Sequence, residues 1–150
     1  MNKRTNIGES LTDLVLETFR LNGQVLAAGN RLTKPHELTS ARWQVMGAIH
    51  LAGRALTVAQ IARRMGLTRQ AVQRIVNDLQ QIEMVELTAN PDHKRAPLVA
   101  LGDKGEQAYV AVDEAQITWI NELANGLSER QVAGTVKLLK LLSSRLEPPD

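Results

Sequence analysis

The sequence has 150 residues, of which 43% are hydrophobic and 23% charged, and its formal net charge is +2. These proportions are ordinary for one folded domain, or for a compact pair of domains that share a core. Because the chain contains no cysteine, disulfides, thiolate nucleophiles and thiol redox sensing are excluded. No apolar run is long enough to span a membrane, and the first ten residues lack the apolar core of a signal peptide, so we expect a cytoplasmic protein.

The first part of the chain predicts a long helix. Residues 1–6 read as a loose polar end, and apolar residues then recur at helical spacing from Ile7 to Leu26. We expect this helix to end near Gly29. The pair Lys34-Pro35 breaks the pattern, because proline cannot continue a helix.

A second helix is predicted between a cap at Thr39 or Ser40 and a stop at Gly53. Leu56 is expected to add a short strand beside a later hairpin. The apolar residues that mark this second helix are Trp43, Met46 and Ile49.

Residues 57–79 predict two helices joined by a tight turn. Thr57 and Gln60 form a capping box at the start of the first helix, and Gly66 supplies the left-handed conformation that ends it. Thr68 is the expected N-cap of the second helix, and Ala62 leaves room where the two helices cross. The apolar residues of the two inner faces are Val58, Ile61, Ala62 and Met65, then Ala71, Val72, Ile75, Val76 and Leu79. The pattern is that of a helix-turn-helix.

The opposite face of the second of these helices carries long hydrogen-bonding side chains. Such side chains reach base edges and phosphates in the major groove of DNA. The candidates for this contact are Arg69, Gln70, Gln73, Arg74 and Asn77, with Thr68 at the helix start. The alternative is an ordinary helical hairpin with a solvated polar face. The scarcity of acids on this face, with Asp78 at its border, favours nucleic acid.

Two short apolar runs, Met84–Thr88 and Leu98–Leu101, predict a β-hairpin. Its long tip, residues 89–97, is rich in turn formers and carries Lys94 and Arg95. A basic hairpin after a helix-turn-helix is a wing, which contacts a phosphate backbone or the minor groove. The alternative is a solvated tip with incidental charge. Residues 54–95 hold seven basic and four acidic side chains, so the chain's positive excess lies in this segment.

After the hairpin, the sequence predicts two closing helices. Asp103 and Glu106 read as a capping box for a helix that continues to about Asn125. Ser128 and Gln131 form a similar signal for the last helix, which ends before Pro148-Pro149.

The terminal helices, at about 10–29, 103–125 and 128–146, are more apolar than a lone DNA-binding module requires. Burying this surface yields roughly 25 cal/mol per Å², so we expect a two-fold homodimer. The alternative is that the last helix is buried within its own subunit. The predicted organisation is a DNA-binding lobe at 39–101 and a helical dimerisation region at 7–38 and 102–147. The expected fold class is mainly α: a winged helix-turn-helix with long N- and C-terminal dimerisation helices.

The order and size of these elements resemble the MarR family of winged helix-turn-helix transcriptional regulators. The most specific segments are LTVAQIARRMGLTRQAVQRIVNDLQQIEMVEL and the wing DHKRAPLVALGDKG. The resemblance implies that Arg95 enters the minor groove. The departures from the family pattern are Asn90 and His93 where two aspartates are usual, Asp92 in place of an arginine, Gly102 in place of a threonine, and Met84 in place of a glycine before the first wing strand.

The resemblance also implies regulation by a small molecule. An anionic or phenolic effector is expected between the dimer helices and the DNA-reading lobes, where Trp43, His50 and Arg20 are candidate lining residues with structural roles equally open. The residues do not distinguish repression from activation, although a repressor is expected. Nothing predicts a cofactor or an enzyme, and the three histidines lack metal-ligand spacing.

Three functional hypotheses remain from the sequence. The first is a homodimeric regulator that binds a pseudo-palindromic site on double-stranded DNA. The second is a winged-helix interaction or dimerisation module without specific DNA binding. The third is a small-molecule-binding protein, or an enzyme, that uses the crevice between its helices.

Overall fold

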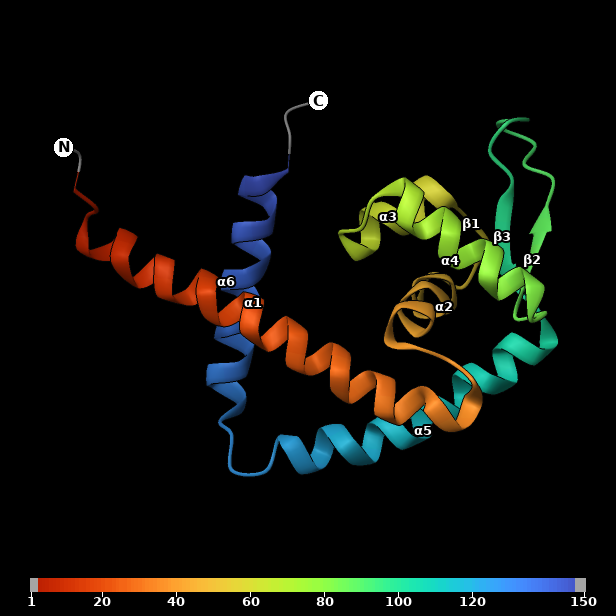
Figure 1. The fold of residues 1–150 in the computed structure, drawn as a ribbon. Coiled ribbons are helices and arrows are strands. Elements are labelled where there is room, and N and C mark those ends of the chain that lie inside the picture. The colour runs from red at the N-terminus through yellow and green to blue at the C-terminus, as the bar shows by residue number, and fades with distance from the viewer. Residues whose placement is uncertain (1–2, 148–150) are drawn as a thin grey trace. The chain divides into compact units, whose positions relative to one another are not determined.

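The computed structural model describes residues 3–147, so Pro148-Pro149, predicted to end the last helix, lies outside the described residues. The fold is mainly helical with one small sheet, which confirms the predicted fold class (Figure 1). The elements, in chain order, are α1 (Asn6–Thr33), a short 3₁₀ helix η1 (Lys34–His36), α2 (Ser40–Ala52), β1 (Leu56–Thr57), α3 (Val58–Met65), α4 (Arg69–Gln81), β2 (Val85–Thr88), β3 (Leu98–Leu101), α5 (Asp103–Leu123) and α6 (Glu129–Leu146). The chain divides into two compact units between Ala115 and Gln116. The predicted lobe at 39–101 stays a prediction.

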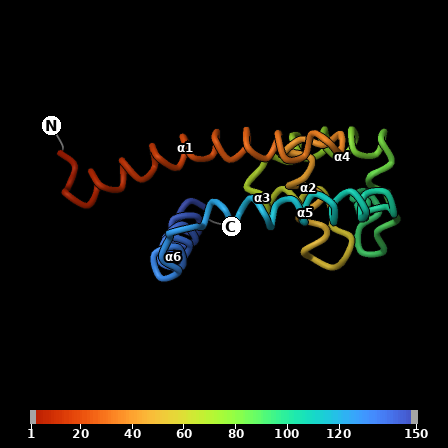
Figure 2. The backbone as a smooth tube through the Cα atoms, turned by 90° about the horizontal axis from the view of Figure 1, so that it is seen from below, coloured from red at the N-terminus to blue at the C-terminus, as the bar shows by residue number. Residues whose placement is uncertain are grey.

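Helix α1 begins earlier and ends later than the sequence predicts, and it forms one continuous helix (Figure 2). The Thr5 hydroxyl accepts a hydrogen bond from the Gly8 N–H at 3.1 Å, which starts the helix at Asn6. The predicted stop at Gly29 is wrong, because Gly29 lies where α1 and α2 approach each other closely and not at a turn. A Cβ there would clash with Ser40 Oγ of α2, and that hydroxyl donates to the Leu26 carbonyl at 2.6 Å.

Helix α2 is capped as predicted at both ends. The Thr39 hydroxyl accepts from the Arg42 N–H at 3.2 Å, so Thr39 rather than Ser40 is the N-cap. Gly53 ends the helix in the left-handed conformation, at φ 62°. The break at Lys34-Pro35 is the 3₁₀ turn of η1.

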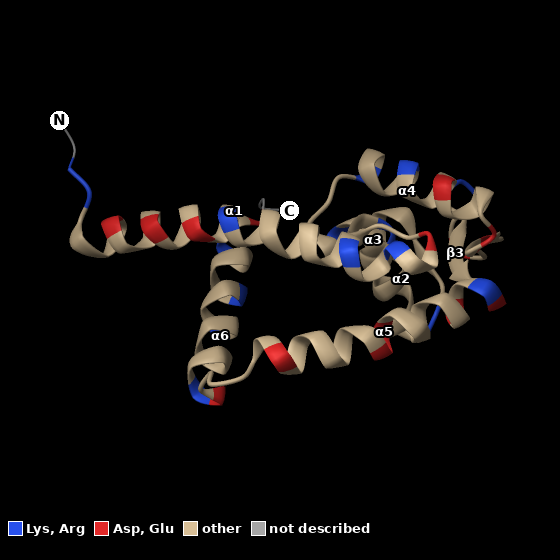
Figure 3. Cartoon of the chain, turned by 60° about the horizontal axis from the view of Figure 1, so that its bottom comes forward, with Lys and Arg blue, Asp and Glu red and all other residues tan. Residues whose placement is uncertain are grey.

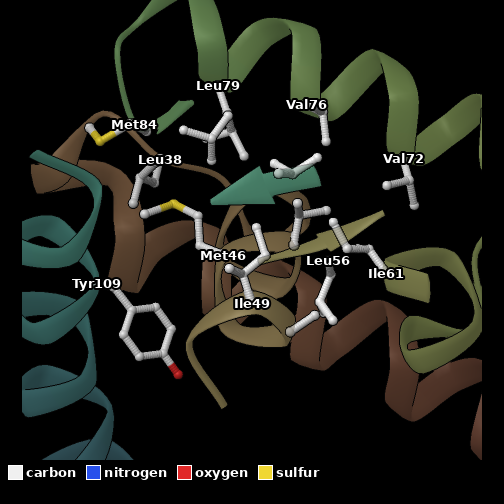
Figure 4. Close-up of a cluster of buried hydrophobic side chains, with 14 of the residues drawn as sticks. Leu38, Met46, Ile49, Leu56, Ile61, Val72, Val76, Leu79, Met84 and Tyr109 are labelled. Carbon is white, nitrogen blue, oxygen red and sulfur yellow. The ribbon is translucent and has the colours of Figure 1, made fainter. Parts of the chain in front are cut away.

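The core of the first unit forms around α2, which contacts α1, α3, α4 and β3. Met46 and Ile49 of α2 lie among Val72, Val76 and Leu79 of α4 (Figure 4). These five side chains are buried, and full burial of such a side chain stabilises the fold by about 1.5–3 kcal/mol. The core therefore fixes which face of α4 points outward.

The sheet is antiparallel and has the strand order β1-β3-β2. Leu56 pairs with Val99, so the predicted short strand at Leu56 is confirmed. The hairpin register pairs Val85 with Leu101 and Thr88 with Leu98. Strand β1 thereby attaches the start of α3 to the base of the hairpin.

The turn between α4 and β2 differs from the expectation that Met84 takes the place of a family glycine. The left-handed residue is Glu83, at φ 60°, and Met84 is buried. The Met84 N–H donates to the Leu79 carbonyl at 2.9 Å and the Glu83 N–H donates to the Gln80 carbonyl at 3.1 Å. These two bonds form a Schellman motif, in which the left-handed position normally holds glycine. Glu83 therefore occupies the position at which a glycine would be least strained.

Helix α5 begins against this turn. The Lys104 ammonium donates to the Ile82 carbonyl at the end of α4, at 2.9 Å. The predicted capping box at Asp103 is wrong. Asp103 is already helical, the Glu106 N–H bonds the Gly102 carbonyl at 2.9 Å, and the Glu106 carboxylate contacts His50 instead. The helix ends at Leu123, slightly before the predicted Asn125.

Helix α6 belongs to the second unit. Ser128 is its N-cap, as predicted, but the Ser128 side chain makes no capping hydrogen bond, so the capping box with Gln131 is wrong. None of its residues is buried within the described chain. No helix within residues 3–147 is long and apolar enough to cross a membrane.

Candidate DNA-binding surface

Helix α4 is held by local sequence signals at its start. The capping box predicted at Thr57 is present, with the Gln60 N–H donating to Thr57 Oγ1 at 3.2 Å and the Thr57 N–H donating to Gln60 Oε1 at 2.9 Å. Gly66 ends α3 in the left-handed conformation, and the Thr68 hydroxyl accepts from the Ala71 N–H at 3.1 Å. The chain therefore leaves α3 and enters α4 through a turn that its own residues specify.

The polar face of α4 is open to solvent. Val72, Val76 and Leu79 have no exposed area, which turns the opposite side of the helix outward (Figure 4). The exposed residues of this face are Arg69, Gln70, Gln73, Arg74 and Asn77, and Thr68 at the N-cap is exposed as well. Their predicted exposure is confirmed, and their contact with DNA stays a prediction.

Two side chains on this face are bonded to each other. Gln73 Nε2 donates to Asn77 Oδ1 at 2.9 Å, across one turn of the helix. Asp78 at the border lies 3.7 Å from Arg42 of α2, measured from its Oδ2 to Arg42 Nη2. The charge of this acid is thus partly offset by a cation, and basic residues lie along α3 and α4 (Figure 3).

The hairpin tip is braced by Asn90. Its Nδ2 donates to the Ala96 carbonyl at 2.8 Å, and its Oδ1 accepts from the Asp92 N–H at 3.0 Å. These bonds close the loop across its base and leave Lys94 and Arg95 exposed. The sequence marks Asn90 only as a departure from the family pattern, and no sequence signal separates this role from an ordinary turn residue.

A groove of about 340 Å³ lies between α4 and the hairpin. It brings together Arg69, Gln70 and Gln73 of α4 with Arg95 of the tip. The remaining predicted residues, Thr68, Arg74, Asn77 and Lys94, do not line it. The groove is completed by residues that sequence reasoning missed: Thr57, Val58, Ala59, Ala96 and Pro97. They line it because β1 pairs with β3, and the sequence predicts the strand at Leu56 beside the hairpin but not its register.

Each of the three candidate effector residues has a structural partner. Arg20 lies 3.6 Å from Glu17 on the surface of α1. Trp43 packs near Gly29, because a Cβ added at Gly29 would lie 3.8 Å from the Trp43 ring.

His50, the third candidate, lies at the end of α2. Its Nδ1 is 3.0 Å from Glu106 Oε2, and its ring stacks on Tyr109 with 4.3 Å between the ring centroids. Burial raises the pKa of Tyr109 above its ordinary value, and the carboxylates of Asp113 and Glu106 raise it further. The Tyr109 phenol is thus held neutral beside the His50–Glu106 pair.

The fold and this surface define a winged helix-turn-helix protein. A family model described as the MarR family matches residues 36–96. The chain is 36% identical over 129 residues to uncharacterized proteins of Mycobacterium bovis (Mb2034c) and Mycobacterium tuberculosis (Rv2011c), covering 86% of this chain and 89% of theirs.

Solved structures share the fold. A mutant MarR from E. coli, complexed with operator DNA, matches with a TM-score of 0.77 at 22% identity, over 92% of this chain and 99% of that chain. MosR of M. tuberculosis, in complex with DNA, matches with a TM-score of 0.74 at 19% identity, over 89% and 98%. BldR of Sulfolobus solfataricus matches with a TM-score of 0.80 at 20% identity, over 95% and 100%. The chain belongs to the MarR family, whose members are transcriptional regulators and not enzymes.

Proposed function

We propose that this protein is a homodimeric transcriptional repressor that binds a pseudo-palindromic operator on double-stranded DNA. The observation that supports this most is the groove in which Arg69, Gln70 and Gln73 of α4 meet Arg95 of the wing. Side chains of this type reach base edges from a helix in the major groove, while a basic hairpin holds the flanking backbone or minor groove. Thr68, Arg74, Asn77 and Lys94 extend the same contact on either side.

The homodimer is supported by apolar surface that the single chain leaves uncovered. On α6, the exposed fractions of Leu138, Leu139 and Leu141 are 42%, 37% and 47%. On α1, the exposed fraction of Phe19 is 71%. Pairing two copies through such helices removes this surface from water and gives the complex two recognition helices, which enter successive major grooves about 34 Å apart. A monomer in sedimentation at micromolar concentration would exclude this part of the proposal.

DNA binding is tested by fluorescence anisotropy with duplexes from the protein's own promoter region, in the presence of unlabelled competitor DNA. Arg95→Ala should weaken binding to all duplexes and reduce the slope of log K against log salt by about 0.9, because one phosphate contact is lost. Arg74→Ala should cost about 1–3 kcal/mol and relax specificity at one position. Arg20→Ala is the matched control, since it removes one exposed charge from α1.

If competitor DNA removes all binding of the wild-type protein, the DNA-binding proposal fails and the interaction module without specific DNA binding takes its place. Equal salt slopes for Arg95→Ala and Arg20→Ala would mean that the wing does not contact DNA. For the repressor role, a reporter under the bound promoter should be expressed more strongly when the protein is absent. Lower expression in its absence would make the protein an activator.

We also propose that a small aromatic or anionic effector releases the protein from DNA. This rests on membership of the family, and no described residue is assigned to the effector. A thermal-shift screen of aromatic acids should find compounds that raise the melting temperature and weaken operator binding together. A compound that stabilises the protein without any effect on operator binding would count against release.

A further inference from the structure

The hydrogen bond between Gln73 and Asn77 fixes the orientation of an amide on the DNA-facing side of α4. A glutamine amide carries one oxygen that accepts and an NH₂ group that donates twice. In this structure one of the two donors is used, because Gln73 Nε2 donates to Asn77 Oδ1 at 2.9 Å. No other hydrogen bond within residues 3–147 uses Oε1 or the second N–H of this exposed side chain, so one acceptor and one donor of the same amide remain open to a base.

This remaining pair of groups matches one base. In the major groove adenine presents N7, which accepts, next to its 6-amino group, which donates. Guanine presents two acceptors there, whereas cytosine presents one donor and thymine one acceptor beside a methyl group. An amide that offers one acceptor and one donor in a fixed order therefore pairs twice with adenine.

We propose that Gln73 reads an adenine in each operator half-site, and that Asn77 is the positioning residue that holds the Gln73 amide in the adenine-reading orientation. The inference rests on the proposed function, because it names the base that the α4 surface selects. Gln73 lines the groove beside Arg69 and Gln70, whereas Asn77 does not. We accordingly place Gln73 at the selected base, whereas Asn77 lies one helical turn further along α4 and orients the Gln73 amide.

Gln80 provides the matched control. It has the same side chain and is exposed on α4, but it does not line the groove. Among the hydrogen bonds of residues 3–147, none involves its side-chain amide. Gln80→Ala should therefore leave the adenine preference assigned to Gln73 unchanged.

The experiment begins with duplexes that the wild-type protein enriches from a random pool. Single base-pair substitutions then give the preference at each half-site position. Gln73→Ala should reduce the preference for adenine at one position by about 5- to 150-fold, the value of one bidentate contact. Gln73→Glu should move the preference at that base pair toward cytosine, because a carboxylate only accepts hydrogen bonds.

Base analogues show whether the same two atoms are read. At the selected position, 7-deazaadenine lacks the N7 acceptor and purine lacks the 6-amino donor. Each analogue should weaken binding of the wild-type protein and of Gln80→Ala, and cause no further loss in Gln73→Ala. This coupling between side chain and base separates direct reading from a general loss of affinity.

Asn77 is tested by rescue. Asn77→Ala frees the Gln73 amide and should lower the preference for adenine over guanine. Asn77→Asp keeps the acceptor for Gln73 Nε2, so it should retain that preference even though its added charge weakens binding to all duplexes. A merely structural role of Asn77 would lower binding to every base equally and leave the ratio unchanged.

The possible failures are distinct. If the wild-type protein enriches no duplex, the proposed function fails and this inference fails with it. If duplexes are enriched but Gln73→Ala alters no adenine position, only the inference is overturned. A guanine preference that depends on Gln73 would also overturn it, because the amide would then offer both donors to the base.

Discussion

Replacing Gly105 by alanine tests the junction between the wing and α5. Gly105 is a buried residue in the first turn of α5. A Cβ there would clash with the carbonyl oxygen of Met84 and lie 3.0 Å from its carbonyl carbon and 3.4 Å from its Cα. Since all three are backbone atoms, no side-chain rotation relieves the clash. Either α5 or the strand that follows Met84 has to move.

The magnitude follows from what that movement disturbs. Forcing extra volume into a packed site costs about 1–3 kcal/mol. The Met84 carbonyl also accepts the Gly102 N–H at 3.1 Å, and weakening this bond adds about 1 kcal/mol. Alanine in place of glycine within a helix stabilises the helix by about 0.5–1 kcal/mol, which partly offsets these costs. We therefore expect Gly105→Ala to lower the free energy of unfolding by about 1–3 kcal/mol, which lowers the melting temperature by roughly 3–10 °C.

The assay is urea unfolding followed by circular dichroism, at one protomer concentration because the stability of the proposed dimer would depend on that concentration. Gly23→Ala is the control, since nothing lies within 4 Å of a Cβ at that helical glycine. Gly23→Ala should raise the free energy of unfolding by about 0.5–1 kcal/mol. If Gly105→Ala were as stable as the wild-type protein, the close approach of α5 to Met84 would be refuted.

Three further predictions concern single side chains. Glu83→Gly should stabilise the protein by about 0.5–1 kcal/mol in urea unfolding, because Glu83 holds a left-handed conformation at φ 60°, and a loss would contradict this reading. Tyr109, the chain's one tyrosine, has its pKa raised above the ordinary 10.0, so tyrosinate absorbance should appear at higher pH in native than in urea-unfolded protein. The stability from the neutral phenol is present below pH 10 and lost as the pH rises through the native pKa, and Tyr109→Phe should lack this loss. Asn90→Ala should speed amide hydrogen exchange across residues 91–96 and leave exchange in α2 unchanged, whereas equal protection of the tip would refute the brace.

Much of the helix-turn-helix could be predicted because each boundary carries its own local signal. The hydroxyls of Thr57 and Thr68 and the left-handed Gly66 act within a few residues of themselves, so a single sequence reveals them. The exposed face of α4 followed from helical periodicity alone.

The errors occur where a distant segment decides the outcome. Gly29 looks like a helix stop, but Ser40 packs against it and α1 continues. Glu106 looks like a capping residue, but its carboxylate is engaged by His50, which is remote in sequence. The groove beside Arg95 depends on the pairing of β1 with β3, and strand register is a tertiary property.

The brace at Asn90 affects what a salt titration measures. Both hydrogen bonds join the neutral Asn90 side-chain amide to backbone groups. These bonds that hold the hairpin tip in shape therefore involve no pair of opposite charges. Dissolved ions screen charged pairs strongly and neutral hydrogen bonds little. The tip should keep its shape from dilute buffer to concentrated salt. For the DNA contact proposed above, ionic strength should then change only the strength of the contact between the hairpin tip and the duplex, and the slope of log K against log salt should report phosphate contacts rather than ordering of the loop.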